Sequence, residues 1–136
     1  MISKTFEAKV ENLNNVLSFV ESELENHEAS MKVMMPISVA VEELFVNVAS
    51  YAYEGNVGQC TIEMDFVDDD VIFNMIDSGF EFNPVEKDDP DISLSAEERG
   101  IGGLGILMVK KYMDSVTYER IDGKNILTMK KRFKNV

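Results

Sequence analysis

The amino-acid sequence predicts an α+β two-layer sandwich, in which three helices cover one face of a mixed, mostly antiparallel sheet of about five strands. Apolar residues recur at three- and four-residue spacing in 12–28 and 36–53, the period of an amphipathic helix. They alternate with polar residues in 59–66, the period of a half-buried strand. Strands joined by hairpins rather than crossovers give antiparallel or mixed sheets with the helices on one face.

The three helices are expected in the first half of the chain and after residue 103. A short strand over 3–9 precedes the first helix, over 12–28. The second helix starts at Pro36, because proline fits the first turn, where its missing N–H would be unpaired anyway. It ends near Glu54-Gly55-Asn56. The third helix is predicted over 104–113.

The remaining strands are predicted as two hairpins separated by a long loop. The charged turn 68–70 joins 59–66 to a second strand over 71–76. Asp122-Gly123 lies between alternating segments, which is a strong signal for a tight hairpin. Residues 81–99 carry two prolines, many acids and little periodicity. A loop this long in a compact domain is usually functional, and a lid is the expected role.

Length and composition indicate one soluble domain spanning residues 1–136. The chain is 45% hydrophobic and 28% charged, with a single cysteine, Cys60, which excludes an internal disulfide and a cysteine-cluster metal site. We find no apolar run whose length approaches the ~20 residues needed to cross a bilayer, and no signal-peptide core. We therefore expect a cytoplasmic protein without membrane contact.

The net charge of −12 argues against nucleic-acid binding, which depends on neutralising phosphates. The same charge would repel an anionic nucleotide, so a nucleotide site would need local N–H donors and a metal. It also suits a partner with a basic surface, although simple solubility explains it equally well.

Glu43 and Asn47 are four residues apart on the second helix, so their side chains share a face. Half-buried among apolar neighbours, a carboxylate and an amide need polar partners. A hydrated magnesium ion would provide them, with the amide as ligand and the carboxylate as orienter of water or proton acceptor. An ordinary polar helix stripe is the alternative.

Asp77 ends an apolar strand and is followed by Ser78-Gly79. A strand-end aspartate can accept a hydrogen bond from the amino group of a nucleotide base, and a glycine lets a ring approach the backbone closely. The alternative is an ordinary aspartate-containing turn after a strand.

The segment 100–105, Gly-Ile-Gly-Gly-Leu-Gly, leads directly into the third helix. Its glycines expose successive N–H groups, and the helix N-terminus adds positive potential, so phosphates are favoured there. The segment is neither a Walker loop nor a dinucleotide fingerprint.

His27, followed by Glu28, is expected to be an ordinary surface histidine rather than a phosphoacceptor.

Four blocks, 42–47, 77–79, 100–105 and 123–128, resemble in their order the N, G1, G2 and G3 boxes of the GHKL ATPase superfamily, which includes gyrase, Hsp90, histidine kinases and MutL. The small size, the absence of a histidine-bearing module and the sequence of 43–53 narrow the resemblance to the anti-sigma factor serine-protein kinases of bacterial partner switching. The resemblance covers roughly 37–133, with a departure at Tyr51, where many members have histidine, and another at 81–84.

The resemblance implies a GHKL-type fold, ATP and Mg²⁺ as cofactors, and a role for each block. Glu43 would act as general base on a substrate serine, and Asn47 would bind magnesium. Asp77, with Gly79 beside it, would bind the adenine amino group, and Thr128 would help to close the adenine pocket. The phosphates would be wrapped, beneath a lid over 81–99, by Gly100, Gly102, Gly103, Leu104 and Gly105.

The resemblance also implies a homodimer that binds a sigma factor in one state and phosphorylates a serine of an anti-anti-sigma protein, thereby regulating transcription. Phosphoryl transfer needs positioning, a metal and a base, which the blocks supply. Two other hypotheses stay open. One is a nucleotide-gated protein-binding module without phosphotransfer, and the other is a detached histidine-kinase catalytic domain.

Overall fold

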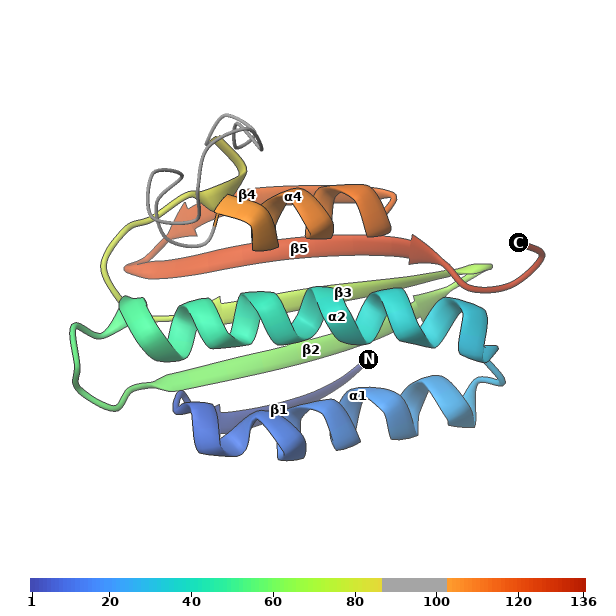
Figure 1. Cartoon of the computed structure of the whole chain (residues 1–136), viewed down its shortest axis with the longest axis horizontal. Coiled ribbons are helices and arrows are strands. Elements are labelled where there is room, and N and C mark those ends of the chain that lie inside the picture. Colours follow the sequence, from blue (N-terminus) through green and yellow to red (C-terminus); the bar gives the residue numbers. More distant parts are fainter. Residues whose placement is uncertain (87–102) are drawn as a thin grey trace.

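The computed structural model describes residues 1–86 and 103–136, which form a sheet covered on one side by helices (Figure 1). Two single 3₁₀ turns, Val10–Asn12 and Pro84–Glu86, and a π-helical turn η2, Val48–Ala52, connect the longer elements. The longer elements are β1 (Ile2–Glu7), α1 (Leu13–Asn26), α2 (Met31–Asn47), β2 (Gln59–Val67), β3 (Asp70–Asp77), α4 (Gly103–Tyr112), β4 (Ser115–Ile121) and β5 (Lys124–Arg132).

The five strands lie in the order β1-β2-β3-β5-β4, and all four neighbouring pairs are antiparallel. This arrangement confirms the predicted fold class. The β4–β5 turn has Asp122 and Gly123 at φ of 50° and 77°, as the Asp-Gly hairpin signal predicts. The central strands β3 and β5 pair along their whole length, from Asp70 with Arg132 to Asp77 with Asn125.

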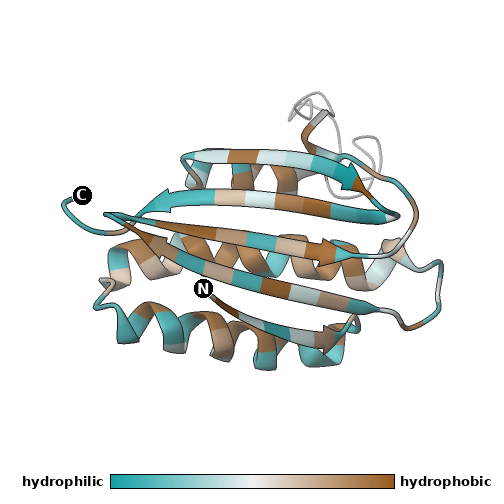
Figure 2. Ribbon diagram, turned by 180° about the vertical axis from the view of Figure 1, so that it is seen from behind, coloured by the Kyte–Doolittle hydropathy of each residue, from teal (hydrophilic) through white to brown (hydrophobic). Residues whose placement is uncertain are grey.

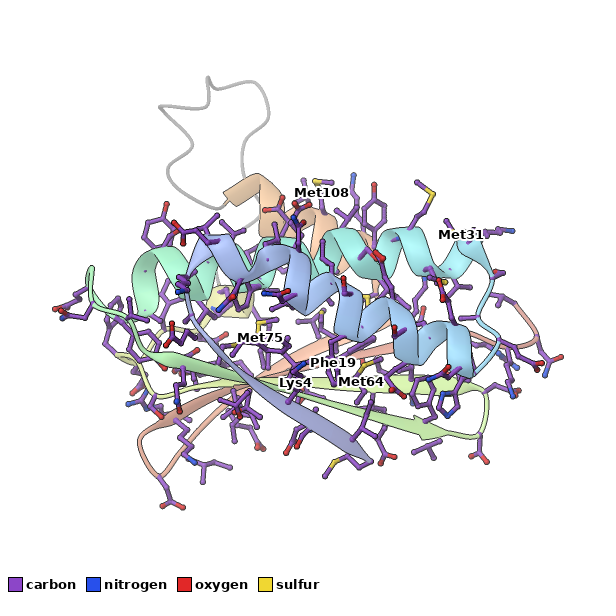
Figure 3. All side chains as sticks on the ribbon, turned by 90° about the horizontal axis from the view of Figure 1, so that it is seen from below. Lys4, Phe19, Met31, Met64, Met75 and Met108 are labelled. Carbon is purple, nitrogen blue, oxygen red and sulfur yellow. The ribbon has the colours of Figure 1, made fainter. Side chains whose placement is uncertain are left out.

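The core lies between the helices and one face of the sheet, while Figure 2 shows the other face uncovered. Strand residues alternate accordingly, because successive side chains point to opposite faces. In β3, for example, Val71, Phe73 and Met75 are buried, and Ile72 and Asn74 between them are only half-buried. Met64 and Met75 lie between the sheet and the helix layer, whereas Met31 and Met108 lie on the outer side of that layer (Figure 3).

The second helix begins at Met31 rather than at Pro36, so the prediction of its start was wrong. Ser30 is extended at the N-cap, and Pro36 is the sixth helical residue. Val33 and Met34 are buried against the rest of the core. This burial favours continuing the helix through the proline, although the ring lacks the N–H that would bond to the carbonyl four residues earlier.

Residues 31–52 form a helical stretch that contains an 18-residue window with a mean hydropathy of 1.4, so by length and composition alone it could cross a membrane. The sequence reading had overlooked this stretch. In the fold it is the central helix of the layer, with α1 on one side and α4 on the other (Figure 1). Several of its apolar residues, such as Ile37, Val41 and Phe45, are buried in the core, whereas Met31 and Met35 are exposed.

Candidate functional site

A cavity of about 260 Å³ lies between the C-terminal end of the α2–η2 helix, the sheet and α4. Its lining is largely apolar, with a small number of polar groups, which is the usual make-up of a small-molecule site. The lining residues are Leu44, Asn47, Val48, Tyr51, Ala52, Met75, Asp77, Phe80, Phe82, Pro84, Ile106, Tyr118, Asn125 and Leu127.

The π-helical turn η2 shapes one wall of this cavity. Three of its five residues, Val48, Tyr51 and Ala52, line the cavity, next to Asn47 at the end of α2. Turns of this kind are rare within helices and are frequent at functional sites. Tyr53 closes the turn. Its hydroxyl donates to the Gln59 carbonyl and accepts from the Ser78 N–H at 2.9 Å, so the helix end is tied to the sheet on both sides.

Asp77 ends β3 inside the cavity and is 7% exposed. Its Oδ1 accepts hydrogen bonds from the Gly79 N–H and from the Asn125 Nδ2, each at 2.9 Å. Within residues 1–86 and 103–136, no side-chain polar atom is both buried and without a partner. Because both bonds end on Oδ1, the second oxygen, Oδ2, is the one available to a donor in the cavity.

Gly79 lies directly against the C-terminal end of η2. A Cβ at this position would overlap the Ala52 backbone, and the next residue, Phe80, donates its N–H to the Ala52 carbonyl at 3.2 Å. The glycine therefore allows the segment after β3 to pack on the helix end and to donate to Asp77 at the same time.

Asn125 is a site residue that the sequence reading missed. It pairs with Asp77 across β3 and β5 and is 7% exposed, so the two form a buried polar pair at the base of the cavity. The signal was present in the sequence, since Asn125, Leu127 and Met129 alternate and must face the same side of the sheet. A polar residue at an inward position needs a partner.

Thr128 is not brought to the cavity. It lies on the uncovered face of the sheet, where its hydroxyl donates to the Asn74 Oδ1 at 2.7 Å. The reason is the two-residue period of a strand, which turns Thr128 away from the side that Leu127 faces. Leu127 and Asn125 occupy the position in the cavity that the sequence reading gave to Thr128.

Glu43 and Asn47 lie one turn apart on the part of α2 that faces α4. Asn47 lines the cavity, whereas Glu43 does not. A Cβ at Gly105 would overlap the Glu43 Oε2, so the Glu43 carboxylate lies against the first turn of α4. A carboxylate at the N-terminal turn of a helix is favoured by the positive end of the helix dipole.

The glycine-rich segment is described only in part. Gly103 is the first residue of α4, Leu104 follows it, and Gly105 is buried in the first turn. Gly100 and Gly102, together with residues 87–99 of the predicted lid, lie outside the described residues. In the described start of that loop, the Asn83 Oδ1 accepts the Val85 N–H at 2.9 Å.

Cys60 and Tyr53, which lie beside the cavity, have raised pKa values, as does Tyr118 in the cavity lining. Burial, with a smaller contribution from the nearby Asp77 carboxylate, raises the pKa of the Cys60 thiol to about 12. Cys60 is fully buried and pairs with Asp77 across β2 and β3. Burial is also the main cause that raises the pKa of the Tyr53 hydroxyl. Both groups are therefore neutral near pH 7.

Comparisons with known proteins place this geometry in context. The chain is 25% identical over 127 residues to an anti-sigma F factor of Caldanaerobacter subterraneus subsp. tengcongensis, covering 93% of this chain and 89% of that protein. It is 29% identical over 98 residues to the serine-protein kinase RsbW of Bacillus cereus, covering 69% of this chain and 61% of that protein.

Solved structures share the fold. The RsbU and RsbW domains of Rv1364c from Mycobacterium tuberculosis superpose with a TM-score of 0.68 at 15% identity, over 97% of this chain and 32% of that one. The catalytic domain of the histidine kinase ThkA superposes with a TM-score of 0.55 at 14% identity, over 98% of both chains. The model of the histidine kinase-like ATPase domain matches residues 6–131. The chain therefore belongs to the family of histidine kinase-like ATPase domains.

Proposed function

We propose that this protein is an ATP- and Mg²⁺-dependent serine-protein kinase that acts as an anti-sigma factor in a partner-switching system. One observation carries the proposal. A largely apolar cavity has an aspartate at its base, with one carboxylate oxygen available, and Asn47 at its edge. Glu43 lies one helical turn before Asn47, beside the first turn of α4.

In this proposal the adenine ring occupies the cavity. Met75, Ile106 and Leu127 supply apolar surface for the ring. The Asp77 Oδ2 accepts a hydrogen bond from the 6-amino group, because Oδ1 is already bonded to Gly79 and Asn125. A buried hydrogen bond to a charged group contributes about 1.5–3 kcal/mol, which favours a base that carries an amino donor at this position.

The phosphates and Mg²⁺ would be held between α2 and the N-terminal end of α4. Among the described residues, no group of three or more His, Cys, Asp or Glu side chains could hold a metal alone. This fits Mg²⁺, which keeps several waters and commonly takes one or two protein ligands together with substrate phosphates. Asn47 would supply an amide oxygen to the metal, which would neutralise charge on the phosphates. Gly100, Gly102, Gly103, Leu104 and Gly105 would wrap the phosphates, assisted by the positive helix end.

Glu43 is the general base in this proposal. It accepts the proton of the substrate serine hydroxyl as that oxygen attacks the γ-phosphorus of ATP, the bond from this phosphorus to the β–γ bridging oxygen breaks, and ADP leaves. Its position beside the first turn of α4 supports the assignment, because the phosphates bind at that same helix end.

The names of the relatives, which are anti-sigma F factor, serine-protein kinase RsbW and serine/threonine-protein kinase BtrW, support the partners that we propose. We propose that the phosphorylated partner is a serine-bearing anti-anti-sigma protein and that a sigma factor is the alternative partner. The protein acts as a cytoplasmic homodimer. The net charge of −12 supports a partner with a basic surface.

The first experiment is a calorimetric titration of ATP with and without Mg²⁺, on wild type and Asn47→Ala. We expect wild type to bind ATP with a strong dependence on Mg²⁺, and the variant to lose that dependence. Asn74→Ala is the matched control, because Asn74 is another half-buried asparagine but lies on the uncovered face. Unchanged Mg²⁺ dependence in Asn47→Ala would remove Asn47 from the metal site.

The second experiment measures phosphate transfer to an anti-anti-sigma protein by Glu43→Ala, with Glu42→Ala as the neighbouring control. We expect Glu43→Ala to keep ATP affinity and to lose transfer by roughly 10²–10⁴-fold, which is the usual contribution of one general base. Retained transfer would contradict the assignment. Binding of ATP by wild type without any transfer would favour a nucleotide-gated binding module. An acid-labile product would favour a histidine kinase domain, because phosphohistidine is acid-labile and phosphoserine is stable.

A further inference from the structure

We propose that Asn125 is a positioning residue of the nucleotide site, which holds the Asp77 carboxylate and the segment 79–82 in the orientation that recognises the amino group of the base. This inference rests on the proposed nucleotide binding and deepens it. The Asn125 side chain lies at the centre of a hydrogen-bond network that joins β3, the segment after it, β4 and β5.

The amide nitrogen of Asn125 fixes Asp77 and the segment after it. Its two hydrogens go to the Asp77 Oδ1 and to the Phe80 carbonyl, each at 2.9 Å. With the Gly79 N–H as a second donor, Oδ1 is held from two directions. The rotation of the carboxylate is thereby restricted, and Oδ2 is the oxygen left for a ligand donor in the cavity.

The amide oxygen of Asn125 is fixed by two residues of β4. It accepts the Tyr118 hydroxyl at 2.6 Å and the Arg120 Nη1 at 3.1 Å. Burial is the main cause that raises the pKa of the Tyr118 hydroxyl, so this group keeps its proton and donates at neutral pH. Because both β4 groups are donors, the oxygen must face them and the nitrogen must face Asp77.

Arg120 also reaches the segment after β3 directly. The same Nη1 donates to the Gly79 carbonyl at 2.8 Å, and the Phe82 N–H donates to the Asn125 Oδ1 at 3.4 Å. Asn125 and Arg120 therefore hold both Asp77 and the backbone that carries the cavity residues Phe80 and Phe82. The Asp77–Asn125 pair at the centre of this network is buried, and Tyr118 and Arg120 are half-buried. Buried polar groups specify one arrangement when all of them are satisfied.

The test compares ATP with purine riboside triphosphate, which lacks the 6-amino group, and uses the ratio of the two dissociation constants. A hydrogen bond from the amino group to a correctly placed carboxylate predicts a wild-type preference for ATP of roughly 10- to 100-fold. For Asn125→Ala we expect a preference for ATP of no more than about threefold, because the carboxylate is no longer fixed. If Asn125 had a purely structural role, its replacement would weaken the binding of both nucleotides equally and leave the ratio unchanged.

Asn74→Ala is the matched control, since the Asn74–Thr128 bond also joins β3 and β5 but lies on the uncovered face. We expect it to keep the wild-type ratio. Arg120→Gln is the second variant and covers the case in which Asn125→Ala does not fold. Arg120 lies outside the cavity lining and acts through Asn125 and Gly79, so its loss should lower the ratio at least threefold.

The possible outcomes test the positioning role and the proposed nucleotide binding separately. If Asn125→Ala and Arg120→Gln both keep the wild-type ratio, the positioning role is overturned while ATP binding stands. A wild-type ratio near one would also overturn it, because Asp77 would then not recognise the amino group. Failure of wild type to bind either nucleotide would overturn the proposed function itself.

Discussion

Gly79 and Gly105 both lie against the long helix of the chain, but they face different kinds of atoms. At Gly79 an added Cβ would overlap the Ala52 backbone, which is held by its own hydrogen bond to the Phe80 N–H. At Gly105 it would overlap only the Glu43 Oε2, the end of a flexible side chain. The two glycines should therefore respond differently to the same substitution.

We predict that Gly79→Ala lowers the free energy of unfolding by about 1–3 kcal/mol and weakens ATP binding, because overpacking against backbone forces a shift. Gly105→Ala should leave the free energy of unfolding within about 1 kcal/mol of wild type, since alanine is the better helix former. It should lower phosphate transfer by about 10²-fold, and by a larger factor than it weakens ATP binding, because the displaced Glu43 carboxylate is misplaced as a base.

Urea unfolding, ATP titration and a transfer assay on the two variants measure these quantities. Gly55→Ala measures the loss that comes from a left-handed backbone alone, because its φ is 86° and an added Cβ there meets nothing. Normal transfer by Gly105→Ala would separate the packing of Glu43 from catalysis. A fully stable Gly79→Ala would show that the contact with Ala52 can relax.

Cys60 gives the protein a pH dependence at the residue scale. Its pKa is raised from 9.0 to about 12 in the folded state, mainly by burial. Below pH 9 the thiol is protonated in both states and adds no pH dependence. Between pH 9 and 12 the unfolded chain loses a proton that the folded chain keeps, so the free energy of unfolding falls as pH rises.

We predict that this loss reaches at most about 1.4 kcal/mol per pH unit from Cys60 and is absent in Cys60→Ala. Urea unfolding at several pH values between 8 and 11 measures the difference in slope between the two proteins. The raised pKa values of Tyr53 and Tyr118 act in the same direction in both proteins, so they largely cancel in the comparison, and Cys60 is only the smallest cause of the Tyr53 shift. Equal slopes would show that the folded thiol ionises near its ordinary pKa.

At the scale of elements, the β4–β5 hairpin matters because it carries three members of the network, Tyr118, Arg120 and Asn125. Its turn requires a left-handed backbone at Gly123, with φ of 77° and open space around the position. The turn therefore depends on backbone conformation and not on contacts of a side chain.

We predict that Gly123→Ala lowers the free energy of unfolding by about 1 kcal/mol, which is the cost of placing a Cβ in the left-handed region. Gly55→Ala, at φ of 86° and also in open space, should show a loss of similar size. Urea unfolding compares the two. A loss at Gly123 several times larger than at Gly55 would mean that the turn also controls the pairing of β4 with β5.

At the scale of the whole molecule, the net charge of −12 destabilises the compact state through self-repulsion. We predict that the free energy of unfolding rises with NaCl, because the screening length falls from about 30 Å at 0.01 M to about 8 Å at 0.15 M salt. Urea unfolding is the right measurement, since guanidinium is itself a salt. As a control, KCl should raise the free energy of unfolding as much as NaCl does at the same concentration, because screening depends on ionic strength. A decrease with salt would show that attractive ion pairs outweigh the repulsion.

Local patterns determined most of the fold from the sequence. The alternation in 59–66 and 71–76 and the Asp122-Gly123 turn specify hairpins without reference to the rest of the chain. The start of α2 could not be predicted in this way. Pro36 gives a strong local signal for a helix start, but the burial of Val33 and Met34 in the assembled core decides the boundary.

The same distinction between local sequence patterns and tertiary contacts applies to the candidate site. The sequence alone was enough to propose Glu43, Asn47 and Asp77 as candidate site residues, because their order and spacing carry chemical information along the chain. The tertiary structure decided that Asn125, rather than Thr128, meets Asp77, and that the Glu43 carboxylate lies against Gly105. Cross-strand register and helix packing set these contacts, and they join residues that are far apart in the sequence. The alternation along β5 indicated the face on which Asn125 lies, but the pairing with Asp77 exists only once the sheet has formed.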